Sequence, residues 1–285
     1  MQLGVTLGRL NPRSWADAAR TADELGFESV WSSDHLVLPV RLAGSLGEQD
    51  AHEALKPTTP LFDPPAYLSY LAALTERVRL GTCVYLLGLR HPFITARSFA
   101  TLDIVSNGRA LCGVGAGWLT TEWEAAGVDP KERGARLDEA IGACRGLWRE
   151  AAVTGQGRYF PFETVAFEPK PVQPAGVPIL VGGESPRALR RAAELGDGWL
   201  GMSHTPDSAR EARTTLERLR DAAGKADRPF TVTVIAKAPT AEEVAAFERA
   251  GVDRLITAPW SSSRTVVEDL RRYAQSLAPH LTGLG

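Results

Sequence analysis

The sequence predicts a (β/α)8 barrel, or TIM barrel, built as a single domain over residues 1–285. Three observations lead to this fold class. Short apolar segments alternate with helical segments along the whole chain. Eight such strand–helix units can be counted, and this alternation requires parallel strands joined by right-handed crossovers. A length of 285 residues is ordinary for an α/β barrel that folds as one domain.

The first half of the chain contains four strand–helix units. Residues 2–7 form a short apolar run, and a helix follows in which Ser14 is the expected N-cap and Gly26 the stop. Because their residues are apolar or β-branched, further strands are expected at 27–32, 78–86 and 110–115. Apolar residues at helical spacing predict helices at 65–75, 92–105 and 133–150.

The second half repeats the pattern. Strands are expected at 177–181, 198–202, 230–236 and 254–258, and helices at 185–195, 206–223, 241–250 and 265–277. Two insertions exceed ordinary loop length: 36–63 follows the second strand, and 152–176 precedes the fifth. The first lies on the side of a barrel where sites form. The second carries β-branched and aromatic residues that indicate a small hairpin.

A doubly wound open sheet is the competing fold. Such a sheet usually carries a glycine-rich dinucleotide-binding turn after its first strand. The residues at this place are Leu7-Gly8-Arg9-Leu10-Asn11, which do not match that turn. The closed barrel is therefore the better prediction.

The composition excludes several classes of partner. A formal net charge of -2 without long charged runs gives no electrostatic reason for binding nucleic acid or an anionic membrane. No window approaches eighteen continuous apolar residues, and the N-terminus lacks a signal-peptide pattern. Three scattered cysteines without a CxxC fit a reducing cytoplasm. No clustered spacing of histidines and acids supports a metal site.

Asp34 and His35 come directly after the second expected strand. Polar residues at the C-terminal ends of barrel strands are functional candidates. Because an imidazole titrates near neutrality, His35 can move a proton or hydrogen-bond a developing charge. Asp34 can orient His35 or accept hydrogen bonds from a ligand. The alternative is structural: Asp34 caps a turn and His35 packs beside it.

Two other strand ends are rich in glycine. The fourth ends in Gly113-Val114-Gly115-Ala116-Gly117-Trp118, and the fifth in Val181-Gly182-Gly183-Glu184-Ser185. Missing side chains let a flat ring or a phosphate approach the backbone, and the helix N-terminus at Ser185 suits an anion. A tight barrel corner and simple capping by Ser185 are the structural alternatives. Together with Asp34 and His35, these ends predict a pocket for a planar cofactor that carries phosphate.

The chain resembles the bacterial luciferase-like monooxygenase superfamily, and is closest to the branch that uses the deazaflavin coenzyme F420. The similarity runs from Gln2 to about Pro279 and is carried by three blocks in order: LGFESVWSSDH, VRLGTCVYLLGLRHPFITARSFATLDIVSNGRALCGVGAGW and PILVGGESPRALRRAAELGDGWLG. The resemblance implies a (β/α)8 barrel, often a homodimer, with a flavin-like ring at the C-terminal mouth.

The resemblance also implies roles for individual residues. Asp34 and His35 would lie beside the reactive face of the cofactor as the catalytic pair. A non-prolyl cis peptide bond would lie behind the ring, and the matching residues are Cys83 and Val84. The remaining residues implied to bind the cofactor lie at the ends of the fourth and fifth strands: Ala116, Gly117, Trp118, Gly182, Gly183, Glu184 and Ser185.

The sequence departs from the resemblance at Trp118. Relatives that oxidise sugar phosphates have a glutamate acid at this position. Either Glu122 or another group then supplies a proton, or the substrate differs. A tryptophan here could stack on a substrate or narrow the pocket, so the substrate is left open.

Three functions follow. The leading one is an F420-dependent oxidoreductase that transfers a hydride between the deazaflavin and a small organic substrate. The second is an FMN-dependent two-component monooxygenase that uses FMNH2 and O2, which needs a dry pocket. The third is a barrel that binds a flavin without catalysis. In the first two cases a separate F420 or flavin reductase is a possible partner.

Overall fold

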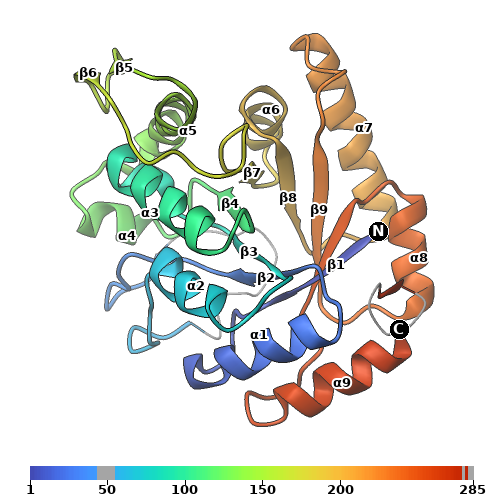
Figure 1. Ribbon diagram of the computed structural model, residues 1–285. Helices are drawn as coiled ribbons and strands as arrows, with labels where there is room; N and C mark the ends of the chain where they lie inside the picture. Colours follow the sequence, from blue (N-terminus) through green and yellow to red (C-terminus); the bar gives the residue numbers. More distant parts are fainter. Residues whose placement is uncertain (44–54, 278–279, 282–285) are drawn as a thin grey trace.

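A closed barrel of eight parallel strands forms the centre of the protein (Figure 1), as the computed structural model shows for residues 1–43, 55–277 and 280–281. The barrel strands are β1 (Gln2–Thr6), β2 (Ser29–Ser32), β3 (Arg79–Thr82), β4 (Ala110–Val114), β7 (Ile179–Gly182), β8 (Gly198–Met202), β9 (Thr231–Ala236) and β10 (Arg254–Thr257). Their order around the barrel is β1-β10-β9-β8-β7-β4-β3-β2. The predicted (β/α)8 fold is confirmed.

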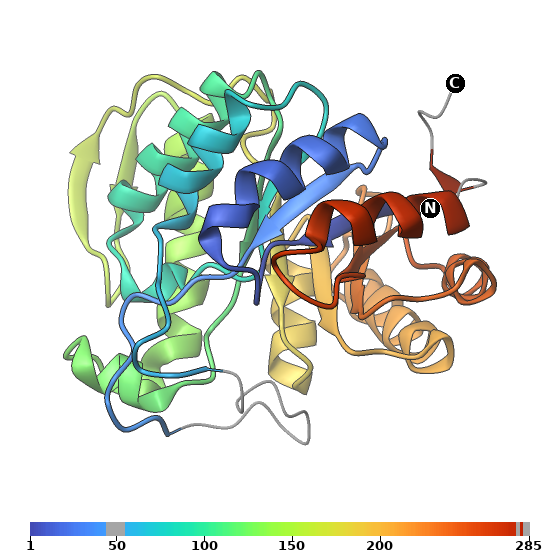
Figure 2. The ribbon, with the colours of Figure 1, turned by 90° about the horizontal axis from the view of Figure 1, so that it is seen from below.

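Helices surround the strands on the outside of the barrel (Figures 1 and 2). They are α1 (Trp15–Glu24), α2 (Pro64–Ala72), α3 (Pro92–Val105), α4 (Thr120–Ala125), α5 (Arg133–Arg149), α6 (Pro186–Leu195), α7 (Pro206–Ala222), α8 (Ala241–Arg249) and α9 (Val266–Ser276). Within the described ranges, none of these helices has the length and apolar character needed to cross a membrane.

Side chains fill the inside of the barrel, and Trp31 is the largest of them. It packs with four apolar residues from other strands, namely Leu111, Leu180, Leu200 and Ile256. A Cβ added to Gly81 would lie 2.4 Å from Cε3 of Trp31, and one on Gly4 would lie 2.9 Å from its Nε1. Because β1 and β3 flank β2, these two glycines make room for the indole. The barrel interior is therefore a packed core. In barrels of this kind, sites form at the mouth, where the C-terminal ends of the strands lie.

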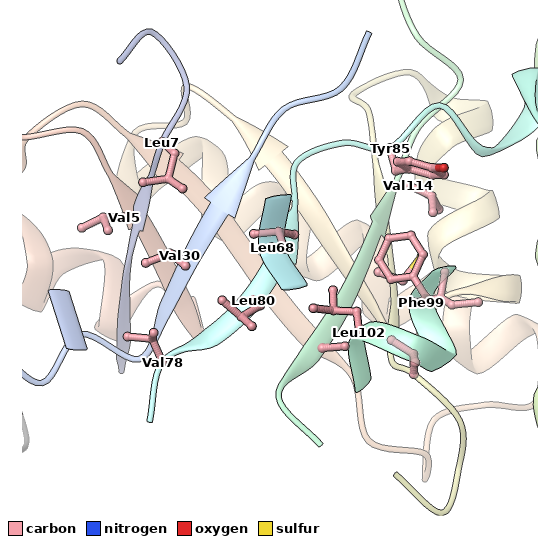
Figure 3. Close-up of a cluster of buried hydrophobic side chains, with 14 of the residues drawn as sticks. Val5, Leu7, Val30, Leu68, Val78, Leu80, Tyr85, Phe99, Leu102 and Val114 are labelled. Atoms are coloured by element: carbon pink, nitrogen blue, oxygen red, sulfur yellow. The ribbon is translucent and has the colours of Figure 1, made fainter. Parts of the chain in front are cut away.

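A second apolar layer lies between the barrel and its helices. Figure 3 shows Val30 of β2 and Leu80 of β3 in this layer with Leu68 of α2 and Phe99 of α3. All four are at most 1% exposed. Burying such side chains contributes about 1.5–3 kcal/mol each. This packing holds the strand ends that carry the candidate site.

The two insertions differ from one another. Residues 152–176 contain the antiparallel pair β5 (Val153–Gly155) and β6 (Phe162–Val165), which confirms the predicted hairpin. Glu139 of α5 accepts the backbone N–H groups of Tyr159 and Phe160 and so ties the hairpin to that helix. The insertion 36–63 is described up to residue 43 and again from residue 55; the prediction for 44–54 lies outside the described residues.

Two local predictions need correction. Ser14 does not cap the first helix; Asn11 caps a preceding 3-10 turn, Pro12–Ser14, by accepting the N–H of Arg13 at 3.0 Å. Because proline favours the first turn of a helix, the helical backbone begins earlier than the apolar pattern. The third strand ends at Thr82 rather than at residue 86, and a 3-10 turn follows at Leu87–Leu89.

Candidate active site

The predicted site residues follow four neighbouring strands. Asp34 and His35 follow β2, Cys83 and Val84 follow β3, and the two glycine-rich segments end β4 and β7. These four strands are consecutive in the barrel order. Because the strands are parallel, their C-terminal ends meet at one rim. The structure therefore brings all the predicted segments onto one continuous arc of the barrel mouth.

The Asp34 carboxylate is buried in an ion pair with Arg90. Nη1 of Arg90 donates to Oδ2 at 2.7 Å and Nη2 to Oδ1 at 2.9 Å, while the N–H of Leu86 donates to Oδ2 at 2.8 Å. Burial raises the pKa of Asp34, and the hydrogen bonds and charge of Arg90 oppose that rise. A bidentate guanidinium favours the ionised carboxylate. Asp34 thus joins the end of β2 to the segment after β3.

Arg90 was not predicted from the sequence. Its guanidinium carbon lies 4.2 Å from the centre of the Tyr85 ring, in a cation–π contact. The sequence indicates Arg90 only as a single cation between the apolar run Leu86–Leu89 and the helix expected from residue 92. A buried cation of this kind requires a buried anion. That rule identifies a partner only once Asp34 is known to be buried.

His35 is held by Glu122, which lies on α4. Nδ1 of His35 is 2.7 Å from Oε2 of Glu122. The other oxygen, Oε1, accepts the N–H of Leu36 at 2.5 Å and that of Val37 at 3.3 Å. The Trp118 ring meets the imidazole edge-on, with ring centres 5.9 Å apart and planes at 89°. The helix α4 was not predicted, so the contact between Glu122 and His35 was missed too.

The peptide bond between Cys83 and Val84 is cis, as the family resemblance implied. The Val84 side chain packs between two of the glycine-rich strand ends. A Cβ added to Gly115 would lie 2.4 Å from Cγ2 of Val84, and one on Gly182 would lie 2.6 Å from its Cγ1. At these two positions the missing side chains make room for Val84. The structure therefore favours the close-packing interpretation of Gly115 and Gly182.

Gly117 marks a different environment. It has a positive φ of 70°, which glycine adopts without strain, and it follows the half-buried Ala116. A Cβ on Gly117 would lie 3.2 Å from Nε1 of Trp123. Trp123 is 1% exposed, and its Nε1 has no hydrogen-bond partner among the described residues. The same Cβ would lie 2.9 Å from Cδ2 of Leu86, so Gly117 allows both the turn and the close packing of these buried side chains.

The end of β7 is tied to the end of β8. Oε1 of Glu184 accepts the N–H of Met202 at 2.8 Å, and Oε2 lies 2.9 Å from Nε2 of His204. Ser185 caps α6 by accepting the N–H of Ala188 at 3.2 Å, as the structural alternative for this residue predicted. Gly183, with φ of 122°, lies two residues before this cap, and a Cβ there would lie 2.9 Å from Cβ of Ala188. Gly183, Glu184 and Ser185 are exposed. The N-terminus of α6 is thus accessible at the rim, which suits an anionic group.

These features fit a flat ring with an anionic tail. Val84 offers an apolar surface, and His35 and Trp118 offer a polar and an aromatic edge. The rim at β7 offers the N-terminus of α6 for a tail. A planar heterocycle needs this combination of apolar faces and a few placed polar groups.

Two relatives illustrate what the chain is similar to in sequence. An uncharacterized protein of Mycobacterium tuberculosis is 32% identical over 268 residues, which are 93% of each chain. The F420-dependent glucose-6-phosphate dehydrogenase of Nakamurella multipartita is 35% identical over 226 residues, which are 77% of this chain and 60% of that enzyme.

Solved structures show the same fold. The monooxygenase RslO1 from Streptomyces bottropensis has a TM-score of 0.78 at 23% identity, over 99% of this chain and 100% of that one. An F420-dependent secondary alcohol dehydrogenase in complex with an F420–acetone adduct also has a TM-score of 0.78, at 20% identity, over 97% of this chain and 98% of that one. The sequence profile of luciferase-like monooxygenases matches residues 2–275. The chain therefore belongs to the luciferase-like monooxygenase family, and its relatives include F420-dependent enzymes.

Proposed function

We propose that this protein is an F420-dependent oxidoreductase that transfers a hydride between the deazaflavin and a small organic substrate. The observation that carries the proposal is the position of His35. It lies on the same arc of the barrel mouth as the Cys83–Val84 peptide, and the hydrogen bond from Leu86 to Asp34 joins the two segments at 2.8 Å. The relatives named as F420-dependent dehydrogenases support the choice of cofactor.

Each segment of the arc has a role in this proposal. When bound, F420 supplies the hydride chemistry, because deazaflavin has carbon where flavin has N5. Val84 would offer its apolar side chain to one face of the ring, with Cys83 beside it. The edge and the tail would be held by residues after β4 and at the end of β7, with Gly182 making room for Val84; these residues are Ala116, Gly117, Trp118, Gly182, Gly183, Glu184 and Ser185. The N-terminus of α6 would hold the phosphate of the tail.

His35 moves the proton in this proposal. Its Nδ1 is engaged by Glu122, and no hydrogen bond to its Nε2 occurs among the described residues. Nε2 therefore accepts or donates the substrate proton while the hydride moves. Both oxygens of Asp34 accept hydrogen bonds from Arg90 or Leu86, so in this proposal Asp34 acts by fixing the chain on either side of the site. Trp118, edge-on to His35, narrows the space for substrate.

We also expect a homodimer, as the family resemblance implies, and a cytoplasmic location, which the three scattered cysteines fit. The exposed apolar side chains include Tyr70 of α2 at 51% and Ile94 and Val105 of α3 at 59% and 55%. Such side chains on neighbouring helices fit an interface between copies of the chain. Light scattering after size exclusion distinguishes a dimer from the 30.7 kDa monomer.

The test is a parallel titration of the purified apoprotein with F420 and with FMN, each followed by cofactor fluorescence. Micromolar F420 binding and much weaker FMN binding are the expected result. Substrates are then screened by the oxidation or reduction of bound F420. Preference for reduced FMN contradicts the proposal and identifies a monooxygenase that needs a reductase. Binding of neither cofactor also contradicts it, and so does tight binding without turnover of any substrate.

A further inference from the structure

We propose that Glu122 is a positioning residue that fixes the tautomer of His35. In this arrangement the imidazole keeps its proton on Nδ1 and presents Nε2 as a proton acceptor to the barrel mouth. The effect on turnover rests on the proposed function, whereas the tautomer itself is a property of the protein alone.

The contacts of Glu122 carry the inference. Its side chain is 1% exposed, and both oxygens already have donors. Oε1 accepts two backbone N–H groups, from Leu36 at 2.5 Å and Val37 at 3.3 Å. Those two donors fix the carboxylate and leave Oε2, 2.7 Å from Nδ1, facing the imidazole. Because an ionised carboxylate only accepts hydrogen bonds, the proton between the two groups belongs to Nδ1 of His35.

The same contacts exclude a direct role in proton transfer. A carboxylate that is buried and fully engaged with His35 and the backbone does not reach a substrate. Glu122 acts through His35, which is 15% exposed and also contacts Trp118 edge-on. The hydrogen bond to Glu122 and the edge-on contact with Trp118 together hold the orientation of the His35 ring. When Nε2 accepts a proton from the substrate, the imidazolium that forms is paired with Glu122.

The substitution Glu122→Gln separates the two roles of the carboxylate. A glutamine oxygen still accepts the N–H groups of Leu36 and Val37, so the backbone contacts are kept. Its amide nitrogen then faces Nδ1 as a donor, and the ring has to carry its proton on Nε2 instead. The matched control is Glu124→Gln, which removes the same charge from the same helix at an exposed position.

The first measurement is the tautomer, by NMR of protein labelled with 15N-histidine at pH 8.5. His35 is assigned from the signal lost in His35→Asn. We expect Nδ1–H in the wild type and in Glu124→Gln, and Nε2–H in Glu122→Gln. An Nε2–H ring in the wild type overturns the inference. If Glu122→Gln does not fold, the wild-type spectrum alone decides.

The second measurement is turnover with F420. We expect Glu122→Gln to lower kcat by about 10²–10⁴-fold, the range lost when general acid–base catalysis fails, with little change in KM or in F420 affinity. In His35→Asn the added Glu122→Gln change has no further effect, since residues that act as a unit are not additive. Additive losses overturn the inference. Absence of F420 binding by the wild type contradicts the proposed function instead, and the NMR result still decides the tautomer.

Discussion

Both carboxylate oxygens of Asp34 accept hydrogen bonds from Arg90, at 2.7 and 2.9 Å. The Asp34 side chain is 0% exposed and that of Arg90 is 10% exposed. Removing one member of a buried ion pair leaves the other charge uncompensated, which typically costs 3–5 kcal/mol. We therefore expect Asp34→Asn to lower the free energy of unfolding by about 3–5 kcal/mol. Urea denaturation followed by circular dichroism measures the change.

Asp207 provides the control for this prediction. It pairs with Arg210 at a similar distance, 2.8 Å, but the side chains are 87% and 54% exposed. Exposed ion pairs contribute at most about 1 kcal/mol, so Asp207→Asn is expected to leave stability nearly unchanged. If the two substitutions lower the free energy of unfolding equally, the Asp34–Arg90 pair contributes no more to stability than an exposed ion pair.

Replacing His35 tests the proton-transfer role. Asparagine retains a hydrogen-bonding group at Nδ1 but cannot exchange a proton near neutral pH, so His35→Asn is expected to lower kcat by about 10²–10⁴-fold. F420 affinity, measured by fluorescence titration, is expected to stay within a few-fold. The control is His91→Asn, because His91 caps α3 outside the site and asparagine also caps helices. Loss of cofactor binding in His35→Asn alone would instead make His35 a binding residue.

Gly115 tests whether Val84 needs the space that the glycine leaves. In Gly115→Ala the new Cβ would lie 2.4 Å from Cγ2 of Val84, so the valine has to move. We expect a loss of about 1–3 kcal/mol in unfolding free energy, as for other overpacked cores, and weaker F420 binding. Adding Val84→Ala removes the clashing methyl groups, and part of the stability is expected to return.

The matched control for Gly115 is Gly142, which lies within α5. A Cβ at this position meets nothing within 4 Å. Alanine has the higher helix propensity, so Gly142→Ala is expected to raise stability by about 0.5–1 kcal/mol. If both alanine variants are stabilised, the glycine after β4 does not serve the packing of Val84.

Cys144 predicts how stability depends on alkaline pH. Burial raises the pKa of its thiol from 9.0 to about 12. Above pH 9 the thiol ionises in the unfolded chain but stays protonated in the folded one, so stability is complete below pH 9 and falls as pH rises towards 12. The contribution is about 1.4 kcal/mol per pH unit within that window.

Comparison with Cys144→Ala isolates this contribution. The variant is expected to lose stability less steeply between pH 9 and 11 than the wild type, while any cost of the missing sulfur is the same at pH 7 and pH 11. Urea midpoints across this range give both slopes. Parallel slopes would show that the thiol is not protected in the folded protein.

The parts of the fold that follow from local pattern were predictable. Strands and helices alternate with clear periodicity, and the rule that sites form at strand C-termini placed His35 correctly at the mouth. The N-cap at Ser185 was also readable, because serine followed by proline marks a helix start. Only short stretches of chain are needed for such predictions.

The parts that depend on distant contacts were not predictable. Glu122 and His35 are 87 residues apart, and no local pattern shows that a short helix brings them together. Likewise, the sequence alone does not tell whether a ligand or a side chain fills the space beside Gly115. The structure shows that the side chain is that of Val84. Periodicity predicts which face of an element is buried, but it does not predict which side chain is its neighbour.

The segment after β2 is fastened to α4 at two points. Glu122 accepts the N–H groups next to His35, and farther along, Ala43 exchanges hydrogen bonds with Thr120 and Thr121. Placing this loop alone in a barrel that lacks a carboxylate at the position of Glu122 would give a histidine without its acceptor. The segments 33–43 and 119–126 therefore form one structural unit of the barrel mouth, although 76 or more residues separate them along the chain.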